Sequence, residues 1–184
     1  MAASRANGPG VRAVVWVQGC SLGCPGCFNP ASHSFAGGEE WSTPGLGDRI
    51  AALAPDVEGI TISGGEPFLQ PAALLDLLRE IRRRTRLSVV VFSGFSLAEL
   101  SRLPEFPELR EHIDILLAGR FVAAERLARG LLGSANKVPH FFTDRYSPDD
   151  LRNVPDCEVV INPDGTLVAT GIDPVAMSPQ ELGK

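Results

Sequence analysis

VVWVQGCSLGCPGCFNP, residues 14–30, joins an apolar run to a loop that contains three cysteines. The apolar run extends over residues 11–18, and its nearly continuous Val and Trp side chains predict a buried β-strand. We expect the strand to end where the cysteine-rich loop begins. A loop at the carboxyl end of a buried strand is a common place for a ligand site in α/β proteins.

The spacing of the cysteines favours a metal or iron–sulfur centre. Cys20, Cys24 and Cys27 share one short loop, so their thiolates can converge on one inorganic centre more easily than they can form disulfides. Structural zinc normally has four protein ligands, whereas a [4Fe–4S] cluster on three cysteines leaves one iron free. His33 could complete a zinc site, but a surface or packing role is favoured. Cys157 lies far along the chain and is interpreted as a small buried hydrophobic residue.

Strand-like and helix-like segments alternate along the rest of the chain. Further strands are predicted over residues 59–63, 87–92 and 113–117, and helices over residues 46–53, 71–83 and 96–103. Apolar strands separated by amphipathic helices indicate βαβ crossovers and a mainly parallel sheet. Roughly four or five such units are too few for a closed eight-stranded barrel of about 250 residues. We therefore expect an α/β fold with an open partial (βα) barrel.

The C-terminal part of the sequence predicts a β-hairpin. Residues 158–161 and 167–170 are apolar runs, and the intervening NPDG is a typical turn sequence. We expect one domain over residues 11–171, preceded by a flexible tail over residues 1–10 and followed by a tail over residues 172–184.

Several motifs resemble those of a known enzyme superfamily. The CxxxCxxC order followed by Phe28 resembles the cluster loop of radical S-adenosylmethionine (SAM) enzymes, and SGGEP at residues 63–67 resembles their second motif. Three further blocks are similar to the activating enzymes of anaerobic ribonucleoside-triphosphate reductases: IDILLAGRF (113–121), GSANK (133–137) and EVVINPDGTLVATG (158–171). Arg120 and Lys137 depart from that subfamily, where Pro and Gln are expected.

The resemblance implies two cofactors and the partial barrel of the radical SAM type. A [4Fe–4S] cluster on Cys20, Cys24 and Cys27 would bind the amine and carboxylate of SAM through its free iron. After reduction, it would split SAM into methionine and a 5′-deoxyadenosyl radical. The family's dependence on a strong reductant implies an electron donor of the flavodoxin or ferredoxin type.

The same resemblance suggests which residues contact SAM. Gly64 and Gly65 lack a Cβ atom and would let the backbone approach SAM, while Glu66 is placed to accept hydrogen bonds from its ammonium group. The remaining candidates would border the adenine or offer polar contacts: Gly26, Phe28, Ser93 and Asn136. By itself the SGGEP segment also fits an ordinary tight connection, and Ser93-Gly94 fits a strand-end turn equally well.

Three functions are consistent with these patterns. The favoured hypothesis is a glycyl-radical activase, which abstracts a hydrogen atom from a backbone glycine of a large partner enzyme such as an anaerobic ribonucleotide reductase. The second is a radical SAM enzyme that acts on a small molecule or peptide. The third is a non-enzymatic iron–sulfur or zinc module, against which the SGGEP turn and the C-terminal hairpin weigh.

The composition and charge of the chain bear on its cellular compartment and on the partners that it can bind. With a net charge of −5 and a pI near 5.2, the chain lacks the positive field that holds a nucleic acid. No apolar run approaches the ~18 residues of a membrane span, and the first residues lack the apolar core of a signal peptide. We therefore expect a cytoplasmic protein with neither a nucleic-acid nor a membrane partner.

Overall fold

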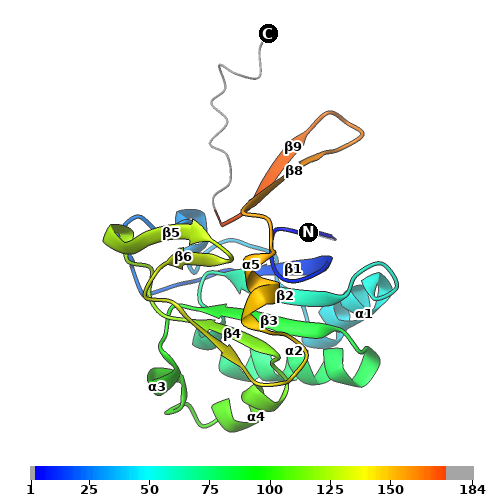
Figure 1. The fold of residues 1–184 in the computed structure, drawn as a ribbon. Helices are drawn as coiled ribbons and strands as arrows, with labels where there is room; N and C mark the ends of the chain where they lie inside the picture. The colour runs from blue at the N-terminus through cyan, green and yellow to red at the C-terminus, as the bar shows by residue number, and fades with distance from the viewer. Residues whose placement is uncertain (1–2, 173–184) are drawn as a thin grey trace.

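A five-stranded sheet in the order β1-β2-β3-β4-β7 forms the centre of the computed structural model, which describes residues 3–172 (Figure 1). The parallel strands are β1 (Arg12–Val17), β2 (Gly59–Gly64), β3 (Ser88–Ser93) and β4 (Ile115–Ala118). The fifth strand, β7 (Val138–Phe141), pairs antiparallel with β4. The prediction of an α/β fold with a mainly parallel sheet is confirmed, and the predicted strands agree with β1 to β4 within a few residues.

The crossover helices cover one face of this sheet. Helix α1 (Thr43–Leu53) connects β1 to β2, and α2 (Pro71–Arg84) connects β2 to β3. The crossover from β3 to β4 holds two short helices, α3 (Leu97–Leu100) and α4 (Phe106–Glu111). Ser96 and Glu99 form a capping box at the start of α3. The helix nevertheless ends before Leu103, which the sequence had placed inside it, and α4 was not predicted.

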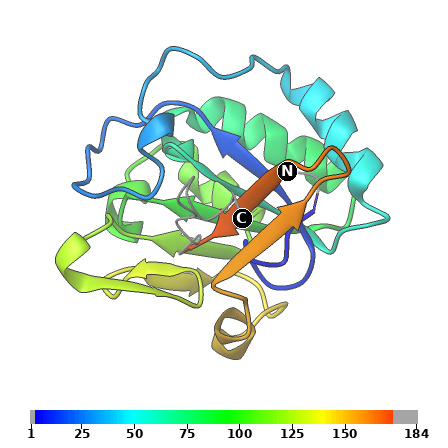
Figure 2. The same ribbon diagram turned by 90° about the horizontal axis from the view of Figure 1, so that it is seen from above.

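Both faces of the sheet are buried, as the apolar strands predict. On the helix-covered face, Ile60, Ile62 and Val91 pack with the apolar side of α2. On the other face, Val90, Ile115 and Leu117 pack with three buried residues from later in the chain: Leu131, Leu151 and Val154. Figure 2 shows α1 and α2 along one side of the sheet and α5 on the opposite side. The core therefore fixes the sheet from both sides and leaves its carboxyl edge for a site.

The second layer consists of short elements that the sequence did not predict. Strands β5 (Arg126–Arg129) and β6 (Leu132–Ser134) form a small antiparallel pair, and helix α5 (Pro148–Arg152) follows β7. Each is too short for a periodic pattern, so packing against the sheet decides its conformation. The remaining short segments are 3-10 helices: η1 (Pro30–Ser32), η2 (Pro67–Leu69) and η3 (Ala123–Glu125).

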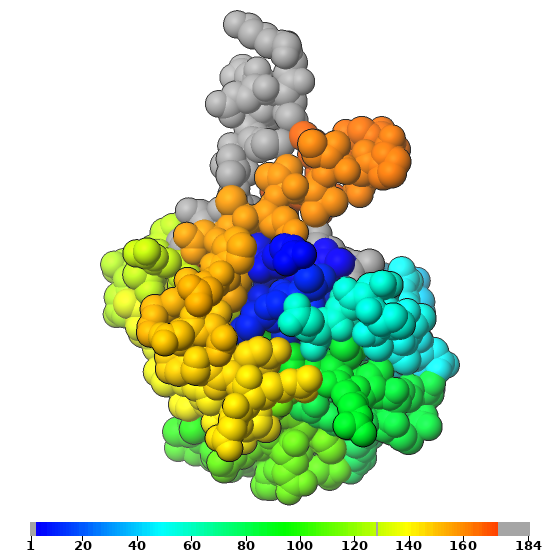
Figure 3. All heavy atoms as spheres, turned by 45° about the vertical axis from the view of Figure 1, so that its right-hand side comes forward, coloured from blue at the N-terminus to red at the C-terminus, as the bar shows by residue number. Residues whose placement is uncertain are grey.

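The predicted C-terminal hairpin is confirmed. Strands β8 (Cys157–Ile161) and β9 (Leu167–Gly171) pair antiparallel, and the turn between them closes through a hydrogen bond from the N–H of Gly165 to the carbonyl of Asn162 at 2.9 Å. Figure 3 shows that the hairpin projects from the body of the protein. At its exposed face, Ile161 keeps 73% of its surface accessible.

The chain ends bear on the predicted domain limits. Ser4 and Arg12 form an antiparallel bridge, which holds the beginning of the described chain against β1. Residues 1–2 and 173–184 lie outside the described residues, so the division at residues 11 and 171 stays a prediction. Within residues 3–172, no helix combines the length and apolarity needed to cross a membrane.

Candidate functional site

A cavity of about 460 Å³ lies at the carboxyl edge of the parallel strands. Its lining comes from the cysteine loop (residues 18–34), from the glycine turn (residues 64–66) and from the end of β3. Lys137 and the base of the β8–β9 hairpin also contribute to it. The three loops that the sequence places after β1, β2 and β3 therefore meet at one site, as expected for a parallel sheet.

Backbone hydrogen bonds close the cysteine loop at its base. The N–H of Gly19 donates to the carbonyl of Ser32 at 2.9 Å, and the N–H of Cys20 donates to the carbonyl of His33 at 3.0 Å. The side chain of Gln18 adds a hydrogen bond to the carbonyl of Ser34 at 2.7 Å. These contacts hold the two ends of the loop together. The segment between them, which carries the cysteines, therefore forms a closed loop beside the cavity.

All three loop cysteines line the cavity and are half-buried, and each is a free thiol. A hydrogen bond from the N–H of Cys27 to the carbonyl of Cys24 at 3.2 Å forms a turn between them. Among residues 3–172, no set of three or more His, Cys, Asp or Glu side chains is already gathered around one point that could hold a metal. The three cysteines therefore line one cavity, but their thiols do not yet surround one point.

The electrostatic surroundings of Cys20 favour the neutral thiol. Burial raises its pKa above the ordinary value, and the charges of Glu66, Cys24 and Cys27 raise the pKa further, against a backbone hydrogen bond at Leu22 that lowers it. A bound metal reverses this balance, because a coordinating thiol loses its proton.

The glycine turn packs directly against the cysteine loop. The N–H of Gly65 donates to the carbonyl of Val17 at 2.8 Å, and the N–H of Glu66 donates to the carbonyl of Gly19 at 2.9 Å. A Cβ atom at Gly65 would lie 2.3 Å from the carbonyl oxygen of Gly19, and Gly64 has a φ of +99°. Glycine is therefore required here for the contact between two loops, a reason that the sequence did not reveal.

Glu66 connects the glycine turn to the end of β3. The residue is 1% exposed. Its carboxylate accepts hydrogen bonds from the N–H of Phe68 at 3.0 Å, the hydroxyl of Ser93 at 2.9 Å and the N–H of Gly94 at 2.6 Å. Burial raises the pKa of Glu66, whereas these hydrogen bonds and the charge of Lys137 act to lower it. The carboxylate thus has a structural role, in addition to any contact with SAM.

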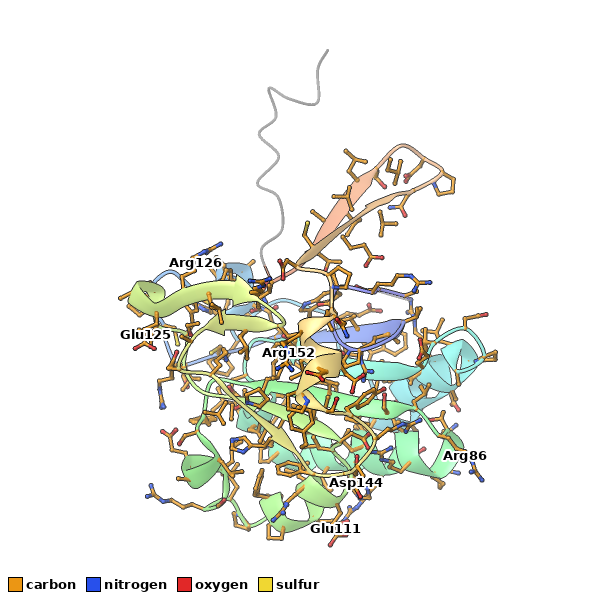
Figure 4. All side chains as sticks on the ribbon, viewed as in Figure 1. Arg86, Glu111, Glu125, Arg126, Asp144 and Arg152 are labelled. Atoms are coloured by element: carbon orange, nitrogen blue, oxygen red, sulfur yellow. The ribbon has the colours of Figure 1, made fainter. Side chains whose placement is uncertain are left out.

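Phe28 anchors the cysteine loop to the second layer. Its ring lies 4.7 Å from that of Phe121, and the guanidinium of Arg126 lies 4.8 Å from its centroid. Figure 4 shows Arg126 at β5. A Cβ atom at Gly133 would lie 2.6 Å from the Phe28 ring, so this glycine admits the aromatic side chain.

Eight of the ten predicted site residues line the cavity: Cys20, Cys24, Cys27, Phe28, Gly64, Gly65, Glu66 and Ser93. Two do not. Gly26 is exposed, and Asn136 accepts a hydrogen bond from the hydroxyl of Ser134 at 2.6 Å and donates to the carbonyl of Arg120 at 2.9 Å. His33 and Cys157 also lie outside the lining, and Cys157 is half-buried rather than fully buried.

The sequence missed several residues of the cavity wall. Trp16, at the end of β1, and Asn7, from the N-terminal segment, both contribute to the lining. Lys137 was noticed only as a departure from a subfamily pattern, although its side chain enters the cavity. The resemblance to the subfamily suggested its neighbour Asn136 instead.

Comparisons with known proteins agree with this geometry. The family described as the 4Fe-4S single cluster domain matches residues 6–140. The anaerobic ribonucleoside-triphosphate reductase-activating protein of Vibrio cholerae is 35% identical over 147 residues, which cover 74% of this chain and 92% of that protein. The corresponding protein of Escherichia coli is 32% identical over 143 residues, covering 73% of this chain and 90% of that protein.

A similarity to a second kind of activating enzyme is more limited in extent. The pyruvate formate-lyase-activating enzyme of Clostridium pasteurianum is 32% identical over 115 residues, which are 60% of this chain and 46% of that enzyme. The present chain thus matches less than half of that enzyme's length.

Proposed function

The chain belongs to the 4Fe-4S single cluster domain family and, within it, to the radical SAM activating proteins, and we propose that it installs a glycyl radical on a partner enzyme of the anaerobic ribonucleotide reductase type. The observation that carries this proposal is that the three cysteines and the glycine turn line one cavity at the carboxyl edge of the sheet. The similarity to activating proteins weighs against a non-enzymatic metal module.

The donor set fits a [4Fe–4S] cluster. Cys20, Cys24 and Cys27 supply three thiolates on one wall, and His33 does not line the cavity to complete a zinc site. When bound and reduced, the cluster supplies the electron that splits SAM into methionine and a 5′-deoxyadenosyl radical, which removes a hydrogen atom from the partner's glycine. The tasks of the protein are to bind, to orient and to exclude water.

Residues in the cavity lining, and two beside it, are candidates for these tasks. The backbone of Gly64 and Gly65 forms the surface against which we place SAM, and Glu66 keeps this surface in register with the cysteine loop and β3. Phe28, together with Gly26, is proposed to border the adenine. Ser93 donates its hydroxyl hydrogen to Glu66, so its contribution to SAM is through the turn that it supports. For Asn136 to contact SAM, its side-chain amide would have to leave the hydroxyl of Ser134 and the carbonyl of Arg120.

We propose that the sheet is an open partial barrel of the radical SAM type. In the described sheet, β1 and β7 are the two edge strands, and they do not pair with each other, so the sheet is open. This shape leaves access for a backbone segment of a partner protein, which a glycyl-radical activase requires. A separate tail after residue 171 is part of the same proposal, whereas the pairing of Ser4 with Arg12 and the place of Asn7 in the cavity lining argue against a separate tail before residue 11.

The electron donor and the compartment complete the proposal. A flavodoxin or ferredoxin type protein would reduce the cluster. Thiols that must stay free for a cluster are maintained in a reducing compartment, which supports a cytoplasmic location.

Electron paramagnetic resonance tests the function directly. Anaerobically reconstituted protein, SAM and a reductant are incubated with the glycyl-radical enzyme of the same source, and a doublet from a glycine-centred radical is expected. The doublet should disappear when Cys24 is replaced by Ala, and also when the partner's acceptor glycine is replaced by alanine. SAM cleavage without a doublet would refute the protein target and favour a small-molecule or peptide substrate.

A further inference from the structure

The β8–β9 hairpin presents an exposed apolar face. Residues directly opposite each other in antiparallel strands share a face, and so do alternate residues along one strand. The register pairs Ile161 with Leu167. It also pairs Val159 with Ala169, so these four side chains lie together and are called the hairpin face. All four are exposed, and Ile161 keeps 73%, Val159 42% and Leu167 37% of its surface accessible.

The opposite face anchors the hairpin at its base. Glu158 accepts hydrogen bonds from the hydroxyl of Ser4 at 2.8 Å and from the N–H of Arg5 at 3.0 Å. Thr170, which is paired with Glu158 in the register, accepts a hydrogen bond from the side chain of Asn7 at 2.9 Å. An isolated two-stranded hairpin is only marginally stable in water, so these contacts fix its position. The hairpin face therefore lies on the side away from the N-terminal segment.

The hairpin face is continuous with the cavity. Ala169 belongs to this face and also lines the cavity, and the chain continues along the cavity wall through residues 170–172. Strand β9 thus runs from the exposed turn of the hairpin down to the site (Figure 3). A protein segment that enters the cavity on this side has the apolar side chains of Leu167 and Ile161 along its way.

The chemistry of the proposed reaction indicates what covers this face. A grouped set of exposed apolar side chains marks an interaction surface. The proposed function requires a backbone glycine of a partner enzyme to reach the cavity, and glycine has no side chain by which it can be recognised. Residues that flank the glycine must supply the recognition. A small-molecule substrate would lie inside the cavity and would have no need of an apolar surface outside it.

We propose that the hairpin face is the docking surface for the partner segment that carries the acceptor glycine, and that it binds apolar side chains flanking that glycine. This inference rests on the proposed function, because that function brings a protein segment into the cavity. It adds the surface on which the segment is held and the kind of side chain that the segment presents.

Biolayer interferometry tests the docking surface. The glycyl-radical enzyme of the same source is immobilised, and the anaerobic, cluster-loaded protein is supplied with SAM. Ile161→Asp and Leu167→Asp should each weaken binding about ten- to a hundredfold, the loss expected when one aliphatic side chain is no longer buried at an interface. At low partner concentration the yield of glycyl radical should fall with the affinity. A higher partner concentration should restore it, because binding and not chemistry is impaired.

Val168→Asp is the matched control. Val168 is the neighbour of Leu167 and is equally exposed, at 38%, but alternation places its side chain on the opposite face. The control introduces the same charge into the same hairpin and should change the affinity for the partner less than about twofold. None of the three substituted residues lines the cavity, so iron content and SAM cleavage without the partner should match the wild type in every variant.

The outcomes separate the docking surface from the reaction. Unchanged partner binding in Ile161→Asp and Leu167→Asp, or equal weakening in Val168→Asp, would overturn the assignment. A dimer of this chain that Ile161→Asp dissociates in analytical ultracentrifugation, with partner binding unchanged, would assign the hairpin face to a second copy and also overturn it. Partner binding that depends on the hairpin face, without formation of a glycyl radical, would support the docking surface and refute the proposed function.

Discussion

The backbone N–H of Gly94 donates a hydrogen bond to the carboxylate of Glu66 at 2.6 Å, and this contact joins the end of β3 to the turn after β2. Together with the donors of Phe68 and Ser93, it gives the carboxylate three partners inside the protein. The glycine turn is in turn bonded to Gly19, which precedes the first cysteine. One buried carboxylate thus links the three loops that form the site.

Replacing Glu66 by Gln tests this link. An amide nitrogen cannot accept a hydrogen bond, so either the N–H of Gly94 or that of Phe68 loses its partner in whichever orientation the amide adopts. We expect the free energy of unfolding to fall by about 1–3 kcal/mol, measured by denaturant titration under anaerobic conditions. The control is Glu111→Gln on α4, far from the cavity (Figure 4), for which a change within about 0.5 kcal/mol is expected. Equal effects of the two substitutions would contradict the link.

The pH dependence of stability contains a contribution from Glu99. Hydrogen bonds from the N–H and hydroxyl of Ser96, and then from Arg120, lower the pKa of Glu99 from 4.5 to about 2. Because the folded pKa lies below the unfolded value, this contribution is complete above about pH 4.5 and is lost as the pH falls toward about 2. The difference in Tm between the wild type and Glu99→Gln should therefore shrink over that range. A constant difference would show that the ionised carboxylate is not responsible.

Much of the fold could be predicted, because its central strands are buried on both faces. Such strands appear in the sequence as short apolar runs, and a helix such as α2 appears as a periodic one. The segment from Arg126 to Phe141 gave no such signal, since its strands are three or four residues long and β5 includes two arginines. Strands β5 and β6 pack around Phe28, through Arg126 and Gly133, whereas β7 is held by its pairing with β4.

The cysteines and the glycine turn of the site could be predicted from the sequence, but the contacts between its loops could not. Motif spacing identified the cysteines and the glycine turn, because these residues are neighbours along the chain. The role of Glu66 as a connector depends on Ser93 and Gly94, which are 27 and 28 positions away. The position of Lys137 depends on carbonyls at the ends of two different strands. Such contacts are set by tertiary structure and leave no local pattern.

The assignment of the cluster ligands leads to a prediction for the cysteines. Anaerobic reconstitution of the wild type should yield about four irons per chain, and Cys20→Ala, Cys24→Ala and Cys27→Ala should each abolish the visible absorbance of the cluster. Cys157→Ala serves as the control, because this thiol starts β8 and does not line the cavity. Stoichiometric zinc in place of iron, or loss of the cluster in the control, would overturn the assignment.

Gly65→Ala examines the contact between the glycine turn and the cysteine loop. The added Cβ atom would lie 2.3 Å from the carbonyl oxygen of Gly19, a backbone atom that cannot rotate away, so the loop before Cys20 must shift. We expect a loss of at least about half of the reconstituted iron and a drop in Tm, with weaker SAM binding as a consequence of the displaced loop rather than of a direct clash with SAM.

Gly23→Asn provides the comparison within the same loop. A Cβ atom at Gly23 has no neighbour within 4 Å, and its φ of +59° is one that Asn tolerates better than most residues. This variant should therefore retain its iron and its affinity for SAM.

If Gly65→Ala kept full iron content and lost only SAM binding, the glycine would be required for the approach of the cofactor alone. If Gly23→Asn lost iron to the same extent, the loop would be sensitive to any added side chain, and the contact between Gly65 and Gly19 would have no special importance.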